Sequence, residues 1–318
     1  MAKTDLSKSI LKRFDRLSAQ RQNWETHWQE VADYMMPRKA DVTKLRSKGD
    51  KRTELIFDSS PLQAVELLAA SLHGMLTNPS TPWFSLRFKD DMENEDEAKE
   101  WLESATETMY AAFNRSNFQQ EIFELYHDLI TFGTAAMYIE EDSEDILKFS
   151  TRHINEVYIA ENDKGRIDTV YRKFKISARA AIQQFGSAVS NKVDTINAKD
   201  PYQEVEIIHA VYPRSDFNPN KKDKSNMPFE SVYIEYSSGD ELSVSGFREF
   251  PFVVPRYLKA SHEIYGRSPA MTALPDVKML NEMSKTTIKS AQKQVDPPLL
   301  VPDDGFILPV RTVPGGLN

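Results

Sequence analysis

Apolar residues recur at three- and four-residue steps through most of the first 133 residues, and this is the spacing of amphipathic helices. The first stripe of apolar residues begins at Ile10, reaches Met35 and is followed by Pro37, so we expect one long helix. Arg21 interrupts this stripe at a position where an apolar side chain is expected. Three more helices are predicted, over residues 60–77, 98–113 and 118–132.

The segments between these helices carry their own signals. In residues 83–88, every second side chain from Phe84 onward is large and apolar, and this period of two predicts a strand. Asn117 is a favourable N-cap for the helix that follows it, and Gly133 can adopt the left-handed conformation that ends this helix. The first 133 residues are therefore predicted to be mainly helical.

After Gly133 the helical spacing gives way to runs of β-branched and aromatic residues. Three pairs of such runs flank short polar turns, which is typical of antiparallel hairpins. The turns lie at residues 143–145, 162–165 and 237–240. One short helix is expected between Ser177, as its N-cap, and Gly186. The predicted fold class is therefore α+β, with a helical part over residues 1–133 and an antiparallel sheet or small barrel over residues 134–264.

A last long helix is predicted from Ser268 to Gln294, because Pro269 suits a first helical turn and two prolines lie beyond the end. One stripe of this helix is cationic, since its lysines are separated by seven, four and four residues. These lysines are Lys278, Lys285, Lys289 and Lys293. In a single copy such a stripe is a solvated face, whereas in a ring of copies it would form rings of positive charge around a central hole.

The composition limits the classes of protein that the chain can represent. A length of 318 residues, with 40% hydrophobic and 28% charged residues, is enough for a substantial core. A formal charge of −8 and a pI near 5.4 disfavour tight binding to nucleic acid, so any contact with DNA has to be local and weak. The chain has no cysteine, which excludes disulfides and thiolate chemistry. It also lacks a long apolar run and an apolar leader, which predicts a cytosolic protein without a membrane span.

The sequence offers few candidates for catalysis. Its six histidines are scattered without a metal-binding spacing, and the motifs of serine hydrolases, phosphate loops and dinucleotide-binding folds are absent. We therefore expect a protein that is not an enzyme and has no catalytic, cofactor or metal site. The acidic residues at 140–145 leave a carboxylate-dependent hydrolase open, although they suit a soluble hairpin tip better. The basic residues at 38–53 are interpreted as a solvated loop, with phosphate binding as the alternative.

Four blocks of the sequence resemble, in the same order, the head-to-tail connecting (portal) proteins of T7-like short-tailed bacteriophages. The blocks are WETHWQEVADYMMP (24–37), FDSSPLQAVELLAASLHGMLTNPSTPWFSL (57–86), SNFQQEIFELYHDLITFGTAAMYIEED (116–142) and YGRSPAMTALPDVKMLNEM (265–283). The resemblance implies a dodecameric ring at one vertex of the phage head, through which a terminase drives double-stranded DNA inward and from which DNA later leaves through the tail. It also implies the major capsid protein, the scaffold, the terminase and a tail adaptor as partners. It implies no cofactor and no membrane, and a virion location after synthesis in the bacterial cytoplasm.

By this resemblance, residues 1–264 would form the wing of a portal subunit, 265–296 its stem helix and 297–318 the start of its clip. The lysines of the stem would line the DNA channel. Four apolar clip residues would contact the terminase and tail adaptors: Leu299, Val301, Phe306 and Ile307. Members of the family are usually much longer, with a second stem helix and a crown after the clip, so the chain resembles a truncated member. Another neck or collar adaptor is the alternative among structural proteins.

Overall fold

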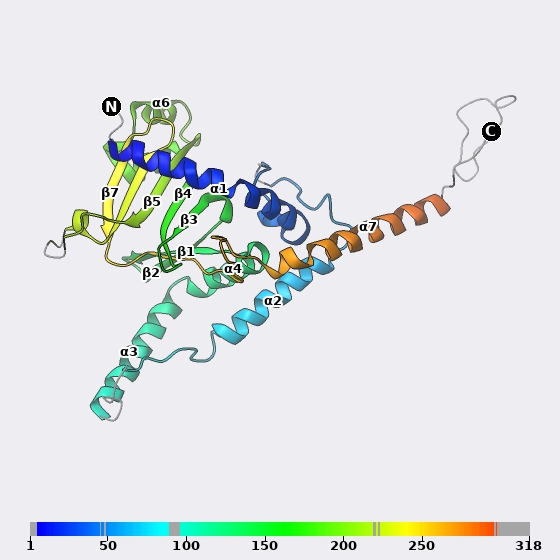
Figure 1. The fold of residues 1–318 in the computed structure, drawn as a ribbon, viewed down its shortest axis with the longest axis horizontal. Coiled ribbons are helices and arrows are strands. Elements are labelled where there is room, and N and C mark those ends of the chain that lie inside the picture. Colours follow the sequence, from blue (N-terminus) through cyan, green and yellow to red (C-terminus); the bar gives the residue numbers. More distant parts are fainter. Residues whose placement is uncertain are drawn as a thin grey trace.

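A computed structural model of the chain describes residues 5–44, 46–47, 49–88, 96–218, 221, 223–295 and 297. Two antiparallel sheets lie beside a group of packed helices, and two further helices project from this body in different directions (Figure 1). The predicted α+β fold class is confirmed. Among the described residues, no helix combines the length and the apolar character that a membrane span needs.

The four helices predicted for the first 133 residues are all present. They are α1 (Asp5–Met35), α2 (Ser60–Leu76), α3 (Asp96–Arg115) and α4 (Phe118–Phe132). Helices α1, α2 and α4 pack around a core that contains Trp28, Val65 and Ile130. Helix α3 is different, because none of its residues is buried and 62% of the Trp101 surface is exposed. Helix α3 packs mainly against the segment before it, since Phe84 and Phe88 stack on Tyr110 and Trp101, while part of its apolar face stays exposed within the described part of the chain.

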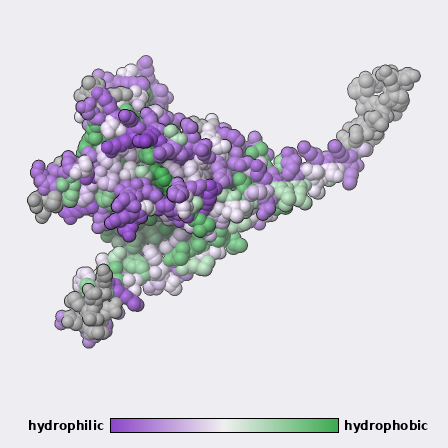
Figure 2. Space-filling model, in the orientation of Figure 1, coloured by the Kyte–Doolittle hydropathy of each residue, from purple (hydrophilic) through white to green (hydrophobic). Residues whose placement is uncertain are grey.

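Only part of the apolar face of α2 is covered by other residues of the chain. Val65 and Ala69 are buried, as predicted. Met75 and Leu76 belong to the same predicted stripe but are exposed, and Leu67 is exposed as well. Figure 2 shows hydrophobic residues at the molecular surface where α2 lies. Helix α2 therefore presents large apolar side chains to the outside of the described chain.

The strands form two antiparallel sheets rather than one curled sheet or a barrel. The larger sheet has the order β3-β4-β5-β6-β7, and the smaller has the order β2-β1-β8. Their strands are β1 (Ala136–Asp142), β2 (Ile146–Arg152), β3 (Val157–Glu161), β4 (Ile167–Ser177), β5 (Glu204–Pro213), β6 (Phe229–Glu235), β7 (Glu241–Phe247) and β8 (Phe252–Val253). The three predicted hairpins are present as β1-β2, β3-β4 and β6-β7.

Two short helices follow β4. They are α5 (Ala178–Phe185), which the sequence predicts, and α6 (Asn191–Lys199), which it does not. Each helix begins after a serine whose hydroxyl oxygen accepts a backbone N–H: Ser177 from Ala180 at 3.3 Å, and Ser190 from Val193 at 3.4 Å. Val193 is the single buried residue of α6, and the helix spans only nine residues, so its few apolar positions do not make a clear helical pattern.

The strand predicted for residues 83–88 is wrong, because this segment joins no sheet among the described residues. Its backbone groups bond to a side chain instead. The Tyr110 hydroxyl accepts the N–H groups of Trp83 and Phe84 at 2.5 and 2.6 Å and donates to the Phe84 carbonyl at 3.0 Å. The Phe84 ring stacks on Tyr110 and the Trp83 ring on Phe118. The alternating pattern therefore reflects packing of an extended segment on helices rather than strand pairing.

The two ends of α4 differ in how well the sequence predicts them. Asn117 precedes the helix as expected, but its side chain does not cap it. The Asn117 amide instead donates to the Phe149 carbonyl at 2.8 Å and accepts the Phe149 N–H at 2.9 Å. These bonds satisfy backbone groups of β2, which is an edge strand. At the other end, Gly133 has a φ of +76° and ends the helix, as predicted.

Arg21 interrupts the apolar stripe of α1 because its side chain binds backbone carbonyls of residues 154–157. Its guanidinium is buried and donates to the carbonyls of Ile154 and Val157 at 2.8 and 2.6 Å, and to that of Asn155 at 2.8 Å. The charge is balanced by Glu25, one helical turn away, at 2.8 Å. Five donors in a fixed planar fork suit this task, which apolar side chains cannot perform.

Candidate functional site: a projecting helix and the network at its base

The predicted long helix is confirmed as α7 (Pro269–Val295). Ser268, immediately before it, is buried and fixes its start: the Ser268 hydroxyl accepts the Met271 N–H at 2.9 Å and donates to the Thr131 carbonyl at 2.8 Å. Pro269 then occupies the first turn, where a missing N–H leaves no bond unmade. The base of α7 is thus attached to the C-terminal end of α4.

Asn281 attaches the middle of α7 to the segment that leads into α2. Its side chain is 7% exposed, accepts the N–H groups of Phe57 and Asp58 at 2.7 and 3.2 Å, and donates to the Leu55 carbonyl at 2.8 Å. Beyond this point, residues 286–295 are all exposed. Figure 1 shows this C-terminal half of α7 leaving the body of the molecule.

The first two lysines of the α7 stripe are paired within the chain. Lys278 donates to Glu30 of α1 at 2.5 Å, and this bond raises the pKa of Lys278. Lys285 lies 3.1 Å from Glu282, and its ammonium is 5.7 Å from the centre of the Phe57 ring. These two cations therefore already interact with neighbouring side chains.

The other two lysines are unpaired. Lys289 and Lys293 are exposed, and neither forms an ion pair or a side-chain hydrogen bond with a described residue. No acidic residue of α7 follows Glu282, so the projecting end of the helix carries positive charge only. Cations near a helix C-terminus are favoured by the helix dipole. The sequence predicts the spacing of the stripe, but it cannot distinguish its paired from its unpaired members.

Apart from residue 297, the predicted clip lies outside the described residues. Leu299, Val301, Phe306 and Ile307, expected to contact the terminase and tail adaptors, all belong to it. The division into residues 1–264, 265–296 and 297–318 also stays a prediction.

The basic segment that follows α1 is held by carboxylates of the same chain. Arg38 donates to both carboxylate oxygens of Glu124, at 2.8 and 2.9 Å. Lys39 lies 2.7 Å from Glu124 and 2.6 Å from the buried Asp128. Both carboxylates belong to α4, so the start of the basic segment is attached to the helix that supports α7.

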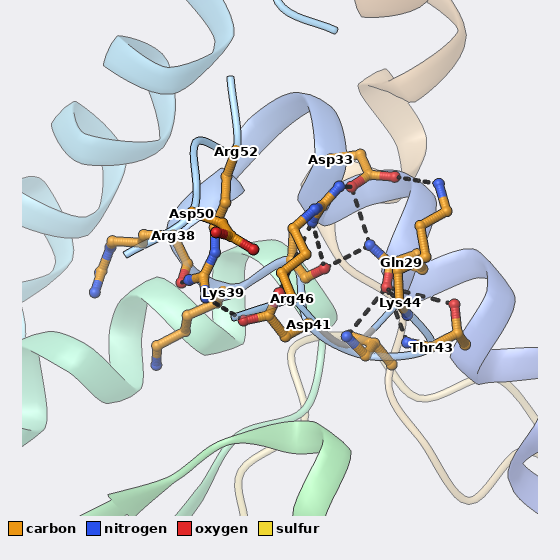
Figure 3. A network of polar contacts seen from close by, with 12 residues as sticks. Gln29, Asp33, Arg38, Lys39, Asp41, Thr43, Lys44, Arg46, Asp50 and Arg52 are labelled. Atoms are coloured by element: carbon orange, nitrogen blue, oxygen red, sulfur yellow. Dashed lines mark hydrogen bonds and ion pairs between the residues drawn. The ribbon is translucent and has the colours of Figure 1, made fainter. Parts of the chain in front are cut away.

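Gln29 and Asp33 of α1 organise the rest of this segment (Figure 3). The side-chain oxygen of Gln29 accepts the Thr43 N–H at 2.9 Å, while Lys44 and Arg46 reach Asp33 at 3.3 and 3.4 Å. The basic residues with a carboxylate partner are Arg38, Lys39, Lys44, Arg46 and Arg52. This pairing favours a structural role for the segment over phosphate binding.

Acid should weaken the part of this network that depends on Glu124. Burial alone would raise the pKa of Glu124, but hydrogen bonds from Arg38 and Lys39 outweigh it and lower the pKa from 4.5 to about 2. A carboxyl with a depressed folded-state pKa contributes stability above its unfolded pKa and loses it as the pH falls through the folded one. We therefore expect the difference in unfolding free energy between wild type and Glu124→Gln to shrink between about pH 4.5 and 2, as measured by urea denaturation.

Glu141→Gln is the matched control for this experiment. Glu141 is an exposed carboxyl, so its replacement should leave the pH dependence of stability close to that of the wild type. A difference between wild type and Glu124→Gln that stays constant across the range would contradict the role assigned to Glu124.

Asp142, among the acidic residues at 140–145, lacks the raised pKa that the general acid of a carboxylate-dependent hydrolase needs. Asp142 accepts the backbone N–H groups of Glu144 and Asp145 at 2.7 and 3.2 Å, and these bonds lower the pKa of Asp142. A general acid at neutral pH requires the opposite shift. Among the described residues, no group of three or more acidic or histidine side chains is placed to hold a metal ion.

Comparison with known proteins identifies the family. The family model described as bacteriophage head to tail connecting protein matches residues 7–318. A "Probable portal protein" of Bordetella phage BPP-1 is 32% identical over 324 residues, and a "Portal protein" of Salmonella phage epsilon15 is 33% identical over 326 residues. Both matches cover the whole chain, which spans 58% of the length of each relative. The resemblance seen in the four sequence blocks is therefore confirmed, and the chain belongs to the bacteriophage head-to-tail connecting protein family.

Proposed function

We propose that this chain forms the wing, the outgoing stem helix and the start of the clip of a phage portal subunit. Copies of the subunit form a dodecameric ring at one vertex of the capsid, and double-stranded DNA passes through this ring during packaging and ejection. The observation that carries the proposal is α7, which leaves the body of the molecule and ends in unpaired positive charge. In a ring, this helix lines the channel.

The charge distribution suits a conduit. The chain has a net charge of −8, so most of its surface repels phosphates, whereas Lys285, Lys289 and Lys293 concentrate positive charge on one helix end. A wall that attracted DNA strongly would hold it, because each neutralised phosphate adds to affinity. A few cations on an otherwise negatively charged wall let the DNA phosphates touch the wall without holding the DNA in place.

Exposed apolar side chains support self-association. Met75 of α2, Trp101 of α3 and Met283 of α7 expose 73%, 62% and 60% of their surfaces. These three helices are only partly covered by the rest of the chain. Large exposed apolar side chains of this kind are typical of a subunit that buries them against neighbouring subunits. The two projecting helices also differ in charge: α3 carries five acidic and two basic residues, and α7 carries two acidic and four basic ones.

The partners follow from the same proposal. The major capsid protein and the scaffold surround the ring, the terminase docks during packaging, and a tail adaptor replaces it in the virion. Leu299, Val301, Phe306 and Ile307 contribute to the contacts with terminase and adaptor. The names of the two curated relatives favour a portal over another neck or collar adaptor.

The test of this proposal has two readouts. Light scattering and negative-stain electron microscopy of the purified chain should detect rings with a hole wide enough for a DNA duplex. In phage particles carrying Lys289→Glu and Lys293→Glu, we expect intact rings but fewer DNA-filled heads, because the reversed charges repel phosphates at the channel wall. The loss of retained DNA should be larger at low ionic strength, where this repulsion is less screened.

The control variant carries Lys12→Glu and Lys164→Glu, at two exposed positions outside α7. It makes the same change in net charge and should leave packaging as in wild type. Unchanged packaging and DNA retention in the Lys289 and Lys293 variant would remove the channel role of α7. A chain that stays monomeric at all concentrations would count against ring formation by these residues.

A further inference from the structure

The attachment of α7 to the body of the molecule changes at Pro275. Before Pro275, the buried residues of the helix are apolar, and they are Ala270, Met271 and Leu274. Residues 276–295 are all described, and the one buried residue among them is the polar Asn281. Val277 packs partly against the core, but the larger apolar residues that follow it are exposed. Beyond its base, α7 therefore depends mainly on polar contacts.

Asn281 makes the most extensive of these contacts. Its side chain accepts two backbone N–H groups and donates to one carbonyl, all within residues 55–58. The other contacts are weaker. The Ser284 hydroxyl donates to a carboxylate of the same segment at 3.4 Å, and Lys278 forms an exposed ion pair with Glu30. The direction of residues 276–295 relative to the body thus depends mainly on one amide.

The contact made by Asn281 can open at low cost. Leu55 and Phe57, which supply two of the three backbone groups, are exposed. Water can therefore replace the amide at these groups once the helix moves away from them. Unpaired backbone groups are costly only where water cannot reach them.

Pro275 is the place where α7 can bend. It lies in the interior of the helix. Because proline has no N–H, the Met271 carbonyl lacks the helical bond from the residue four positions later, and the proline ring crowds that carbonyl. Sharp bends in helices occur mostly at prolines for these reasons. This weak point separates the apolar base of α7 from the part that Asn281 holds.

A small bend at Pro275 would be amplified along the helix. From Pro275 to Val295 the helix spans about 30 Å, so a bend of about 10° moves its end by about 5 Å. Asn281 lies about 9 Å along the helix from Pro275, where the same bend opens a gap of only about 1.5 Å. The Asn281 contact is therefore short in range but controls the position of Lys289 and Lys293.

We propose that Asn281 is a positioning residue: its hydrogen bonds to residues 55–58 fix the direction of the projecting half of α7, and the helix bends at Pro275 when these bonds open. A buried polar group selects one arrangement of a helix among several, which an apolar contact does less strictly. In a ring, the direction of α7 sets the width of the channel, and this consequence rests on the proposed function. The contact and the bend do not depend on it.

Distances between pairs of spin labels on the full chain, measured by double electron–electron resonance, test the proposal. The chain has no cysteine, so introduced cysteines carry the only labels. Gln20→Cys on α1 with Ser290→Cys on α7 reports the projecting half, and Gln20→Cys with Thr272→Cys reports the base; all three positions are exposed. In the otherwise unchanged chain, we expect one narrow distribution for each pair.

Asn281→Leu keeps the size of the side chain and removes its hydrogen bonds. The distribution of the pair at 20 and 290 should broaden or shift by about 4 Å, whereas that of the pair at 20 and 272 should stay unchanged. Adding Pro275→Ala restores the missing helical N–H and should narrow the first distribution again. Gln292→Leu makes the same kind of change at an exposed position of α7 and should leave both distributions unchanged.

Unchanged distances in Asn281→Leu would overturn the positioning role, and equal broadening of both pairs would overturn the bend at Pro275. Circular dichroism checks that each variant folds. If Asn281→Leu does not fold, Asn281→Asp decides, because it keeps the accepted bonds and loses only the donor to Leu55. A distribution as narrow as that of the unchanged chain in this variant would then overturn the proposal.

Electron microscopy separates this inference from the proposed function. Rings of Asn281→Leu should show a central hole of more variable width than rings of the wild type. Absence of rings in the wild type would count against the proposed function and leave the label distances as the test of Asn281. Rings with unchanged label distances in Asn281→Leu would reject the positioning role alone.

Discussion

Replacing Gly133 with alanine should destabilise the chain by about 3 kcal/mol or more. Gly133 ends α4 with a φ of +76°, a conformation that alanine rarely adopts. A Cβ atom at this position would lie 2.3 Å from the carbonyl oxygen of Gly266 and 2.7 Å from the carbonyl carbon of Arg267. Both are backbone atoms of the segment that enters α7, so rotation of a side chain cannot relieve the overlap. Urea denaturation measures the loss as a lower unfolding free energy.

Gly74→Ala is the matched control, because it makes the same substitution inside α2. No atom lies within 4 Å of a Cβ built on Gly74, and its φ is not positive. Alanine should therefore stabilise the helix there, by up to about 1 kcal/mol. The two substitutions should move the unfolding free energy in opposite directions. A Gly133→Ala variant as stable as the wild type would contradict the close approach of α4 and the base of α7.

Replacing Arg21 with methionine should lower the unfolding free energy by about 3 to 5 kcal/mol. Methionine keeps much of the side-chain length but cannot donate, so three backbone carbonyls of residues 154–157 lose the donors that lie 2.6 to 2.8 Å from them. Glu25 also loses its partner. Buried carbonyls without a donor are costly, because water cannot replace the lost bond. The measurement is again urea denaturation.

Arg16→Met on the same helix is the control for Arg21→Met. Arg16 is exposed, so its replacement should change stability by less than about 0.5 kcal/mol. Arg21→Lys should fall between the two, since an ammonium restores the charge but cannot reach the three carbonyls with the geometry of a planar fork. Equal losses for Arg21→Met and Arg16→Met would show that the buried contacts of Arg21 contribute little.

The elements that the sequence predicts well are those that depend on neighbours in the chain. Helix α1 follows from apolar spacing and the proline after it, and α7 follows from its flanking prolines. The three hairpins follow from polar turns between runs of β-branched and aromatic residues. Gly133 ends α4 in the left-handed conformation that glycine adopts most readily, and the residue type alone predicts this end. In each case the favourable conformation is set by residues within one or two turns of each other.

The exceptions depend on residues far apart in the sequence. Residues 83–88 alternate like a strand, but Tyr110 of α3 takes the backbone bonds that a sheet would have made. Asn117 is a good N-cap by type, yet the edge of β2 offers its amide two bonds at once. No local pattern contains these partners, so sequence spacing could not select them.

The same division applies to the candidate site. The sequence by itself determined that α7 is a helix with four lysines on one stripe, because helix geometry fixes the angle between positions. Only the tertiary structure decided that Lys278 meets Glu30, which lies on another helix, while Lys289 and Lys293 stay unpaired on the part that leaves the body. Local conformation follows from bonds within a few residues. The pairing of a charge, in contrast, depends on which distant segments packing brings within reach.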